Sequence, residues 1–484
     1  MGTPKGTDFG IGRPRSREGH WSQAAWAGAA AVMPAAAALI GRMRAVDLAY
    51  HVRAGEAALS TGEIVVKDPY SFTRGGHPWL NQQWGAQIVF ASAHRVWSWA
   101  GVALSYAAAL GAGFALLYRI CRRAGAEART AAVLTILGFL VGASSLGARP
   151  QALAVPLFTG TWLLLSRRDR WTWLVPLLAV VWANVHGSFV LAPVLAAFAF
   201  GEDLVGRRPP GRSASILVAT LAATAVTPFG PTVWSYVADV ATNDTVRNTV
   251  AEWRPPSPLT GAGSLFWLSG VGVAAVATAR RSSVHVLDAA RLVVFFVLGA
   301  LALRSTVWWA LAAPPIVAGW LAVPDERTDR SSTSTPIRGR AAVGAAFVIL
   351  LVAAFSVRSG TDAVTGAPRR LAADAPQVLV GATRRALPAG SRLLVFQPFA
   401  SWFEYALPGD PVMVDSRIEL FPIEVWRDYD TAIVAGEGWQ AILGRDEIAG
   451  VVLPPGAVLA RALRDDGGWI PEADGPAGSV FVRR

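Results

Sequence analysis

Long apolar runs separated by short charged segments are the feature that most constrains how this chain folds. Runs of roughly 17–22 residues recur from residue 23 onward, and about 20 residues of helix cross a hydrocarbon core about 30 Å thick. The composition agrees, because 53% of the 484 residues are hydrophobic and 16% are charged. A soluble protein carries about 25% charged residues. The sequence therefore predicts an α-helical polytopic membrane protein.

The apolar runs predict about eleven transmembrane helices. We place them near residues 23–41, 97–118, 131–147, 151–166, 171–184, 188–204, 214–228, 262–279, 285–302, 305–323 and 341–356. The transmembrane domain would then cover residues 23–356, after an N-terminal tail of residues 1–22. It would include a large first outer loop at residues 42–96.

The positions of the basic residues predict the orientation of the chain in the membrane. Short loops rich in Lys and Arg stay on the cytoplasmic side, and every second connection here is basic, beginning with Arg13, Arg15 and Arg17. We therefore expect a multi-pass protein of the cell membrane with a cytoplasmic N-terminus and an extracytoplasmic C-terminus. This topology explains the net charge of +11, and we expect no nucleic-acid partner. The single Cys121 excludes an internal disulfide.

The composition changes after the last predicted span. Residues 357–390 are polar and are predicted to form a linker or a surface helix. Residues 391–484 predict a small extracytoplasmic α/β domain. We place strands at 392–396, 411–414, 451–453 and 479–482, and helices at 398–406, 422–434 and 439–443.

The first outer loop holds several side chains suited to chemistry. Asp47 and His51 are four residues apart, so a helix beginning here puts them on one face. Asp47 is a candidate general base or metal ligand, with His51 beside it; alternatively, Asp47 caps the following helix. Asp68 and His77 lie in turns, where they contact a substrate or only shape the loop. Trp84 either stacks on a sugar or lies at the membrane interface.

Two arginines lie in predicted outer turns, where the charge rule disfavours them. Arg149 and Arg304 are each a candidate to bind a lipid phosphate, which the planar guanidinium group suits. The alternative is that they pair with Glu252 or Asp47 and hold the helices together. Glu252 belongs to the long outer loop at residues 227–259, which is expected to close over the site.

The segment Trp182–Gly187 places an amide and an imidazole at the outer membrane face. Asn184 and His186 are therefore candidate substrate-binding residues, because polar groups within a membrane are usually functional. A structural role for a buried histidine fits the sequence equally well.

Several short motifs carry a family resemblance. An Asp follows the first span, and the motifs are DPYSFT (68–73), ARPQ (148–151), WANVHGSF (182–189), TPFG (227–230), EWRPP (252–256) and VDSRIELFP (414–422). Together they resemble a largely uncharacterised group of bacterial multispan proteins. That group is similar to the GT-C superfamily of glycosyltransferases, which includes the protein O-mannosyltransferases.

The resemblance implies a membrane glycosyltransferase with a GT-C-like fold. Its donor would be a polyprenyl-phosphate-linked sugar drawn from the membrane lipids, and its acceptor an extracytoplasmic component of the cell envelope. It implies an Asp of the first outer loop as the base, sometimes with a divalent metal such as Mg or Mn. Asp47 matches by position, but Leu48 stands where a second acidic residue is frequent, so the metal stays open.

The sequence thus predicts an inverting transfer in which Asp47 deprotonates the acceptor and Arg149 or Arg304 holds the phosphate. Asp68, His77 and His186 would line the pocket. Two other classes of function remain. One is a non-catalytic assembly or sensor protein with an outer binding domain. The other is a transporter or flippase, which would favour broken helices near the middle of the membrane; the polar groups lie at the outer rim instead.

Overall fold

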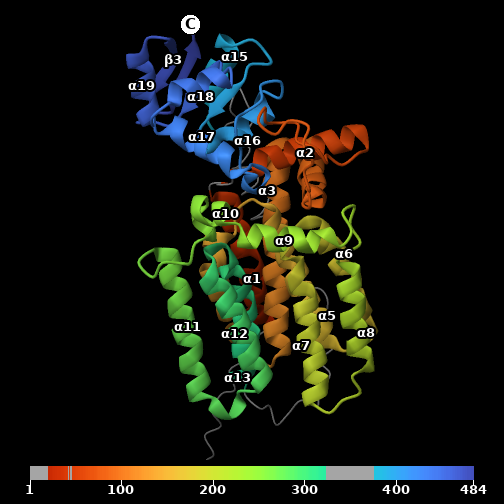
Figure 1. The fold of residues 1–484 in the computed structure, drawn as a ribbon. Helices are drawn as coiled ribbons and strands as arrows, with labels where there is room; N and C mark the ends of the chain where they lie inside the picture. Colours follow the sequence, from red (N-terminus) through yellow and green to blue (C-terminus); the bar gives the residue numbers. More distant parts are fainter. Residues whose placement is uncertain (1–19, 42, 44–45, 323–374) are drawn as a thin grey trace, which may run out of the picture.

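The computed structural model describes residues 20–41, 43, 46–322 and 375–484. It has a bundle of apolar helices at one end and a domain containing a β-sheet at the other (Figure 1). The helices α2 (Leu48–Thr61) and the first part of α3 (Trp84–Arg123) lie between these two parts (Figure 1). The predicted span at 341–356 falls outside the described residues.

The bundle contains a helix for each of the other predicted spans. These helices are α1 (His20–Ile40), α3, α4 (Ala128–Gly142), α5 (Pro150–Arg167), α6 (Val175–Val185), α7 (Leu191–Val205), α8 (Gly211–Ala223), α11 (Gly261–Ala279), α12 (Val286–Leu301) and α13 (Thr306–Trp320). Short 3-10 turns follow or precede several of them, at Ala143–Ser145, Arg170–Leu174, Gly187–Val190, Arg281–Ser283 and Leu303–Ser305.

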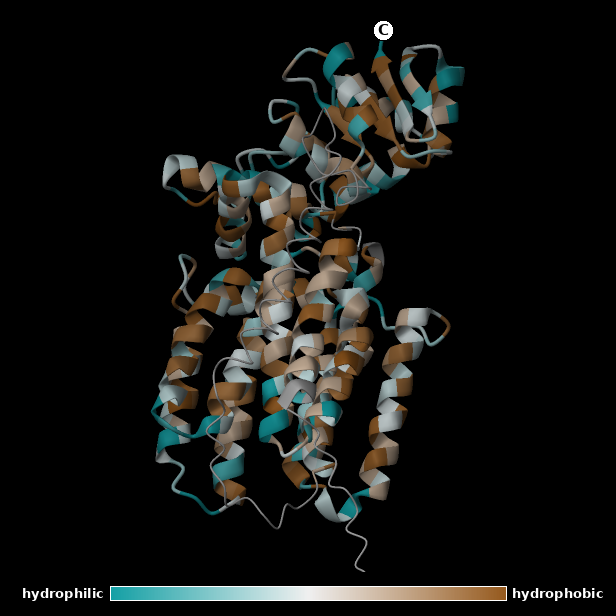
Figure 2. Ribbon diagram, turned by 180° about the vertical axis from the view of Figure 1, so that it is seen from behind, coloured by the Kyte–Doolittle hydropathy of each residue, from teal (hydrophilic) through white to brown (hydrophobic). Residues whose placement is uncertain are grey.

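Five helical segments in the described residues are long and apolar enough to cross a bilayer. They are Gln23–Ile40, Trp84–Arg123, Ala128–Ser145, Gly187–Val205 and Gly261–Ala279. Hydrophobic residues run along the bundle helices, and hydrophilic residues gather at the connections between them (Figure 2). The chain is thus a helical membrane protein, while the count of eleven spans stays a prediction.

Helix α3 begins well before the span predicted near residues 97–118 and includes part of the predicted first outer loop. The structure has a 40-residue helix with non-helical backbone at Trp97 and Ser98, where Ser98 has φ 49°. The outer part of α3 packs against α2, which ends at Gly62 with φ 76°. This pair of helices fixes the position of the residues at the start of α2.

The loop at residues 227–259 is more structured than the sequence predicted. It contains α9 (Thr232–Thr242), α10 (Asp244–Thr249) and a 3-10 turn at Ala251–Trp253. Helix α9 lies across the outer ends of the bundle helices (Figure 1). The predicted covering segment is therefore a helical layer between the bundle and the C-terminal domain.

The C-terminal domain has a four-stranded sheet in the order β1-β2-β4-β3. Its elements are α15 (Gln377–Ala386), β1 (Leu393–Val395), α16 (Gln397–Ala406), a 3-10 turn at Ile418–Leu420, α17 (Ile423–Ile433), α18 (Trp439–Arg445), β2 (Gly450–Leu453), α19 (Val458–Asp466), β3 (Trp469–Gly475) and β4 (Gly478–Arg483). Strand β1 pairs in parallel with β2, and the other pairs are antiparallel. The sequence did not predict α19 or β3.

One predicted strand was wrong, and it reveals how the domain is attached. Residues 411–414 form only isolated bridges, in which Val412 pairs with Leu393 on one side and Ser71 on the other. The Phe72 amide donates to the Val412 carbonyl (3.1 Å), and the Val412 amide donates to the Tyr70 carbonyl (3.0 Å). The first outer loop is thus bonded to the C-terminal domain, and it positions the segment after Val412.

Candidate functional site

A cavity of about 690 Å³ lies where the loops at one end of the bundle meet the C-terminal domain. Its lining comes from the start of α2, the turns before α5 and η3 (Gly187–Val190), helix α9, the turn η6 (Leu303–Ser305) and the segment after Asp415. Of the predicted site residues, it brings together Asp47, Arg149, His186, Glu252 and Arg304.

Four of these residues form a chain of charges across the cavity. The Arg149 Nε lies 3.2 Å from the Asp47 Oδ1, and its Nη1 donates to the Glu252 Oε2. The Arg304 Nη1 lies more loosely, 3.8 Å from the Glu252 Oε1. The sequence left open that Arg149 and Arg304 pair with Glu252 or Asp47, and these ion pairs are present. Asp47 occupies the N-cap position of α2, but its side chain makes no capping hydrogen bond there.

The two arginines differ in how well their charges are balanced. Burial disfavours both charges, but in Arg149 the nearby Asp47 and Glu252 outweigh it and raise the pKa. In Arg304 burial prevails, and the pKa is lowered. The Arg304 guanidinium also lies 4.5 Å over the Trp253 ring. Arg304 thus has the less compensated charge.

Backbone contacts hold Arg304 in place. The Gln151 Nε2 donates to the Arg304 carbonyl (2.8 Å), and the Ser145 Oγ donates to the Leu303 carbonyl (2.7 Å). The Leu303 amide in turn donates to the Arg254 carbonyl (2.9 Å), so the turn is tied to the loop that carries Glu252. The position of the Arg304 backbone is therefore fixed by the fold.

The two predicted histidines occupy different places. His51 lies one turn beyond Asp47 and is buried behind the cavity, with Nδ1 3.4 Å from the Gln87 Nε2. Burial lowers the pKa of His51 to about 4, so the ring is neutral at pH 7. His186 lines the cavity, and its Nδ1 accepts a hydrogen bond from the Ser188 amide (3.1 Å). That bond makes Nδ1 the unprotonated nitrogen.

Four predicted substrate-binding residues lie outside the cavity. The Trp84 Nε1 donates to the Asn184 Oδ1 (2.8 Å), and the Asn184 amide also donates to the Val180 and Val226 carbonyls. These two side chains join helices rather than face the cavity. His77 is exposed at a turn of the first outer loop. Asp68 is buried in a separate network.

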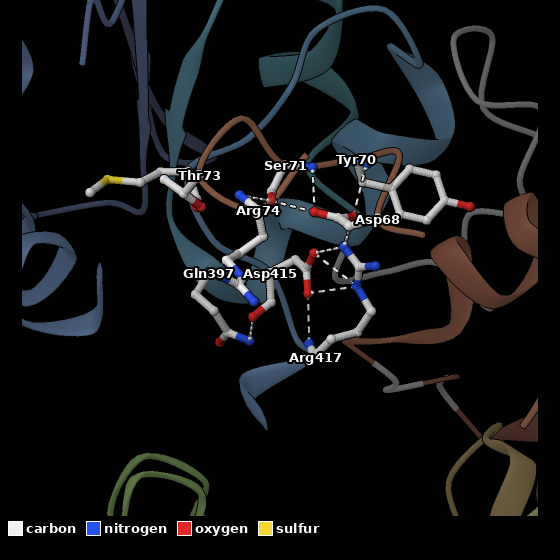
Figure 3. A network of polar contacts seen from close by, with 9 residues as sticks. Asp68, Tyr70, Ser71, Thr73, Arg74, Gln397, Asp415 and Arg417 are labelled. Carbon is white, nitrogen blue, oxygen red and sulfur yellow. Dashed lines mark hydrogen bonds and ion pairs between the residues drawn. The ribbon is translucent and has the colours of Figure 1, made fainter. Parts of the chain in front are cut away.

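That network centres on Arg417, to which the sequence analysis gave no role beyond its place in the motif VDSRIELFP (Figure 3). The Arg417 Nε lies 3.0 Å from the Asp415 Oδ2, and the Nη2 donates to the Asp68 Oδ1 (2.6 Å). Asp68 also accepts hydrogen bonds from the Tyr70 amide (3.0 Å) and the Ser71 hydroxyl (2.5 Å). The predicted turn-capping role of Asp68 is present, together with a buried ion pair to the C-terminal domain.

Aromatic rings surround the same guanidinium. Its Cζ lies 4.6 Å from the Trp79 ring centroid, 5.0 Å from that of Tyr70 and 5.8 Å from that of Tyr50. Such contacts are favourable for a desolvated cation. The rings and carboxylates together fix Arg417 at the edge of the cavity, which it lines.

The sequence reasoning also missed Glu419, which lines the cavity from the C-terminal domain. It accepts a hydrogen bond from the Tyr236 hydroxyl of α9 (2.8 Å), and burial raises its pKa. A signal was present, because the segment VDSRIELFP carries Asp415, Arg417 and Glu419 within a mostly apolar stretch. Such charges in an apolar segment indicate pairing or a site.

The charges around Asp47 bear on the possible divalent metal. Among the residues that the structure describes, no group of three His, Cys, Asp or Glu side chains is placed to hold a metal ion. The Arg149 guanidinium already supplies the positive charge next to the Asp47 carboxylate, where a metal ion would otherwise do so. We therefore derive no step through a metal.

Comparison with known proteins gives one informative result. No protein-family model matches the sequence, and no curated protein sequence matches it either. The fold, however, matches the crystal structure of ArnT from Cupriavidus metallidurans bound to undecaprenyl phosphate. The TM-score is 0.51 with 12% identity, over 96% of this chain and 98% of that chain. The fold is ArnT-like. The match therefore agrees with the helical membrane fold that the sequence predicts.

Proposed function

We propose that this protein is a membrane glycosyltransferase that uses a polyprenyl-phosphate-linked sugar donor. The observation that carries the proposal is the cavity in which Asp47, Arg149, Glu252 and Arg304 meet from separate outer segments. The cavity lies between the apolar bundle and the C-terminal domain, and this position supports a reaction between a lipid and an external acceptor. The ArnT-like fold adds support, since the ArnT crystal structure contains bound undecaprenyl phosphate.

In the proposed reaction, an acceptor hydroxyl oxygen attacks the anomeric carbon of the sugar. Asp47 takes the hydroxyl proton, and the bond between the anomeric carbon and the phosphate oxygen breaks with its electron pair on the phosphate. Arg304 holds that phosphate, because its charge is the less compensated of the two arginines. A single displacement of this kind inverts the anomeric centre.

The other residues support these groups in the proposal. Arg149 holds the Asp47 carboxylate in position at the cavity. Neutral His51, in the next turn of α2, positions the start of that helix without taking a proton. Glu252 links the two guanidinium groups across the cavity. The proposal places the acceptor on the extracytoplasmic side, with the C-terminal domain above the cavity.

The ion pair between Arg149 and Asp47 also favours a second candidate. In a non-catalytic assembly protein, the same chain of charges would only hold the outer loops together. A structural role and a catalytic role differ in what the Asp47→Asn variant does. Asparagine keeps an oxygen for Arg149 but cannot serve as a base.

The decisive test compares Asp47→Asn with the unchanged protein in cells. The first step is to compare lipid-linked sugars and envelope glycans by mass with and without the protein, which identifies the sugar that it transfers. In Asp47→Asn, transfer should fall by about 10²–10⁴-fold, the usual contribution of a general base. Expression should change little, and the melting temperature should fall less than in Arg149→Met, because asparagine keeps an oxygen for Arg149. Full transfer by this variant would exclude Asp47 as the base, and an unchanged glycan profile without the protein would favour the assembly role.

A further inference from the structure

Some polar atoms in the cavity have no role in the proposed reaction. The Gln82 Oε1, the Ser416 Oγ and the Arg417 Nη1 are shielded from solvent and have no hydrogen-bond partner in the described part of the chain. All of these residues line the cavity. Buried polar atoms are almost always hydrogen-bonded in folded proteins, so atoms without a partner indicate a ligand or water.

Contacts on the other side fix the orientation of the Gln82 and Arg417 atoms. The Gln82 Nε2 donates to the Ala183 carbonyl (2.5 Å), which leaves Oε1 free to accept. Arg417 is held through Nε and Nη2 by Asp415 and Asp68, so Nη1 alone remains to donate (Figure 3). Gln82 and Arg417 are each 2% exposed. These atoms form a built site rather than a mobile surface.

The kinds of atom identify the chemistry of the ligand. Gln82 offers an acceptor, Arg417 a donor, and Ser416 a hydroxyl that does both. A phosphate would satisfy the donors but leave the Gln82 oxygen without a partner. The charge of Arg417 is already balanced by Asp68 and Asp415, and the nearby Glu419 disfavours a further anion. A neutral group with several hydroxyls satisfies all three atoms.

We infer that Gln82, Ser416 and Arg417 form a carbohydrate subsite in the cavity, distinct from the phosphate site at Arg304. This inference rests on the proposed function, because it assigns the sugar-binding part of that reaction. The carbohydrate is either the sugar of the lipid donor or part of a saccharide acceptor. In both cases the C-terminal domain supplies part of the binding site.

The test measures binding to the full-length protein in lipid nanodiscs. The first set of probes is undecaprenyl phosphate alone and undecaprenyl phosphate carrying glucose, mannose, galactose or N-acetylglucosamine. The second set is the free methyl glycosides of these sugars, added with saturating undecaprenyl phosphate. The variants are Ser416→Ala and Gln82→Met. The control is Ser401→Ala, because the Ser401 hydroxyl is also buried without a partner but does not line the cavity.

We expect Ser416→Ala and Gln82→Met to weaken carbohydrate binding by about 5- to 10-fold each, as expected for one lost hydrogen bond. Binding of undecaprenyl phosphate alone should not change, and Ser401→Ala should bind every probe as the unchanged protein does. Weaker binding of the glycosylated lipids assigns the subsite to the donor, and weaker binding of the methyl glycosides alone assigns it to an acceptor.

Two results would overturn the inference, and they separate it from the proposed function. If undecaprenyl phosphate binds but no sugar adds affinity that depends on Ser416 or Gln82, the subsite is wrong and the proposed function stands. If undecaprenyl phosphate itself fails to bind, both the proposed function and the subsite are wrong.

Discussion

His51 makes stability depend on pH, because burial lowers its pKa to about 4 from 6.5. Above pH 6.5 the ring is neutral in both the folded and the unfolded chain. Between pH 6.5 and 4 the unfolded chain binds a proton and the folded chain does not, so stability falls as the pH falls. From pH 7 to pH 5 this amounts to about 2 kcal/mol. The loss should appear as a lower melting temperature, and His51→Asn should reduce it. The exposed His77 provides the control, since His77→Asn should leave the pH dependence unchanged.

Substitutions of Arg149 and Arg304 should affect the stability of the protein and its binding of lipid phosphate to different extents. Arg149 lies between two partly buried carboxylates, and leaving buried polar groups without a partner costs about 1–3 kcal/mol. Arg149→Met should therefore lower the melting temperature strongly. Arg304→Met should lower it less, because the ion pair with Glu252 is 3.8 Å long, but should abolish most binding of undecaprenyl phosphate. Equal effects of the two variants on lipid binding would contradict the assignment of the phosphate to Arg304.

At the scale of elements, the close contact between α2 and α3 sets the position of Asp47. A Cβ atom on Gly55 would lie 2.1 Å from the Gln87 carbonyl oxygen and 2.7 Å from the Ala91 Cβ. Gly55→Ala should therefore force the helices apart at a cost of about 1–3 kcal/mol. We expect a lower melting temperature and slower sugar transfer, because Asp47 moves relative to Arg149. Gly272→Ala is the control, since it meets nothing within 4 Å.

The elements also show how far the sequence could predict this structure. Apolar length placed the bundle helices, and the alternation of basic loops put Asp47, Arg149, His186, Glu252 and Arg304 on one face; all five line the cavity. The pattern could not show the helices α9 and α10, because a polar loop and an interfacial helix have similar compositions. Strand β3 was missed because Pro471 and the charged Glu472 and Asp474 interrupt its alternation.

The pairing of distant residues was beyond the sequence for a different reason. Asp68 and Arg417 are separated by 349 positions, and each lies in a segment that also has a local explanation as a turn. Likewise, residues 411–414 are apolar enough to predict a strand, but they form single bridges because the neighbouring partner is the first outer loop. Both features depend on how the two ends of the chain meet, which no local pattern encodes.

For the whole molecule, the ion pair between Asp68 and Arg417 is the main charged link between the first outer loop and the C-terminal domain. Both side chains are at most 1% exposed, so solvent does not compensate for the loss of either charge. Asp68→Ala leaves Arg417 with Asp415 alone and should cost about 3 kcal/mol. Hydrogen exchange should rise in residues 68–74 and 412–417 but not in the bundle helices. Carbohydrate binding should weaken as well, because Arg417 loses one of the contacts that orient Nη1.

A matched control is Asp428→Ala, which breaks the exposed pair with Arg445 in the same domain and should cost at most about 1 kcal/mol. If both variants changed hydrogen exchange equally, the buried pair would not be what docks the domain onto the loop.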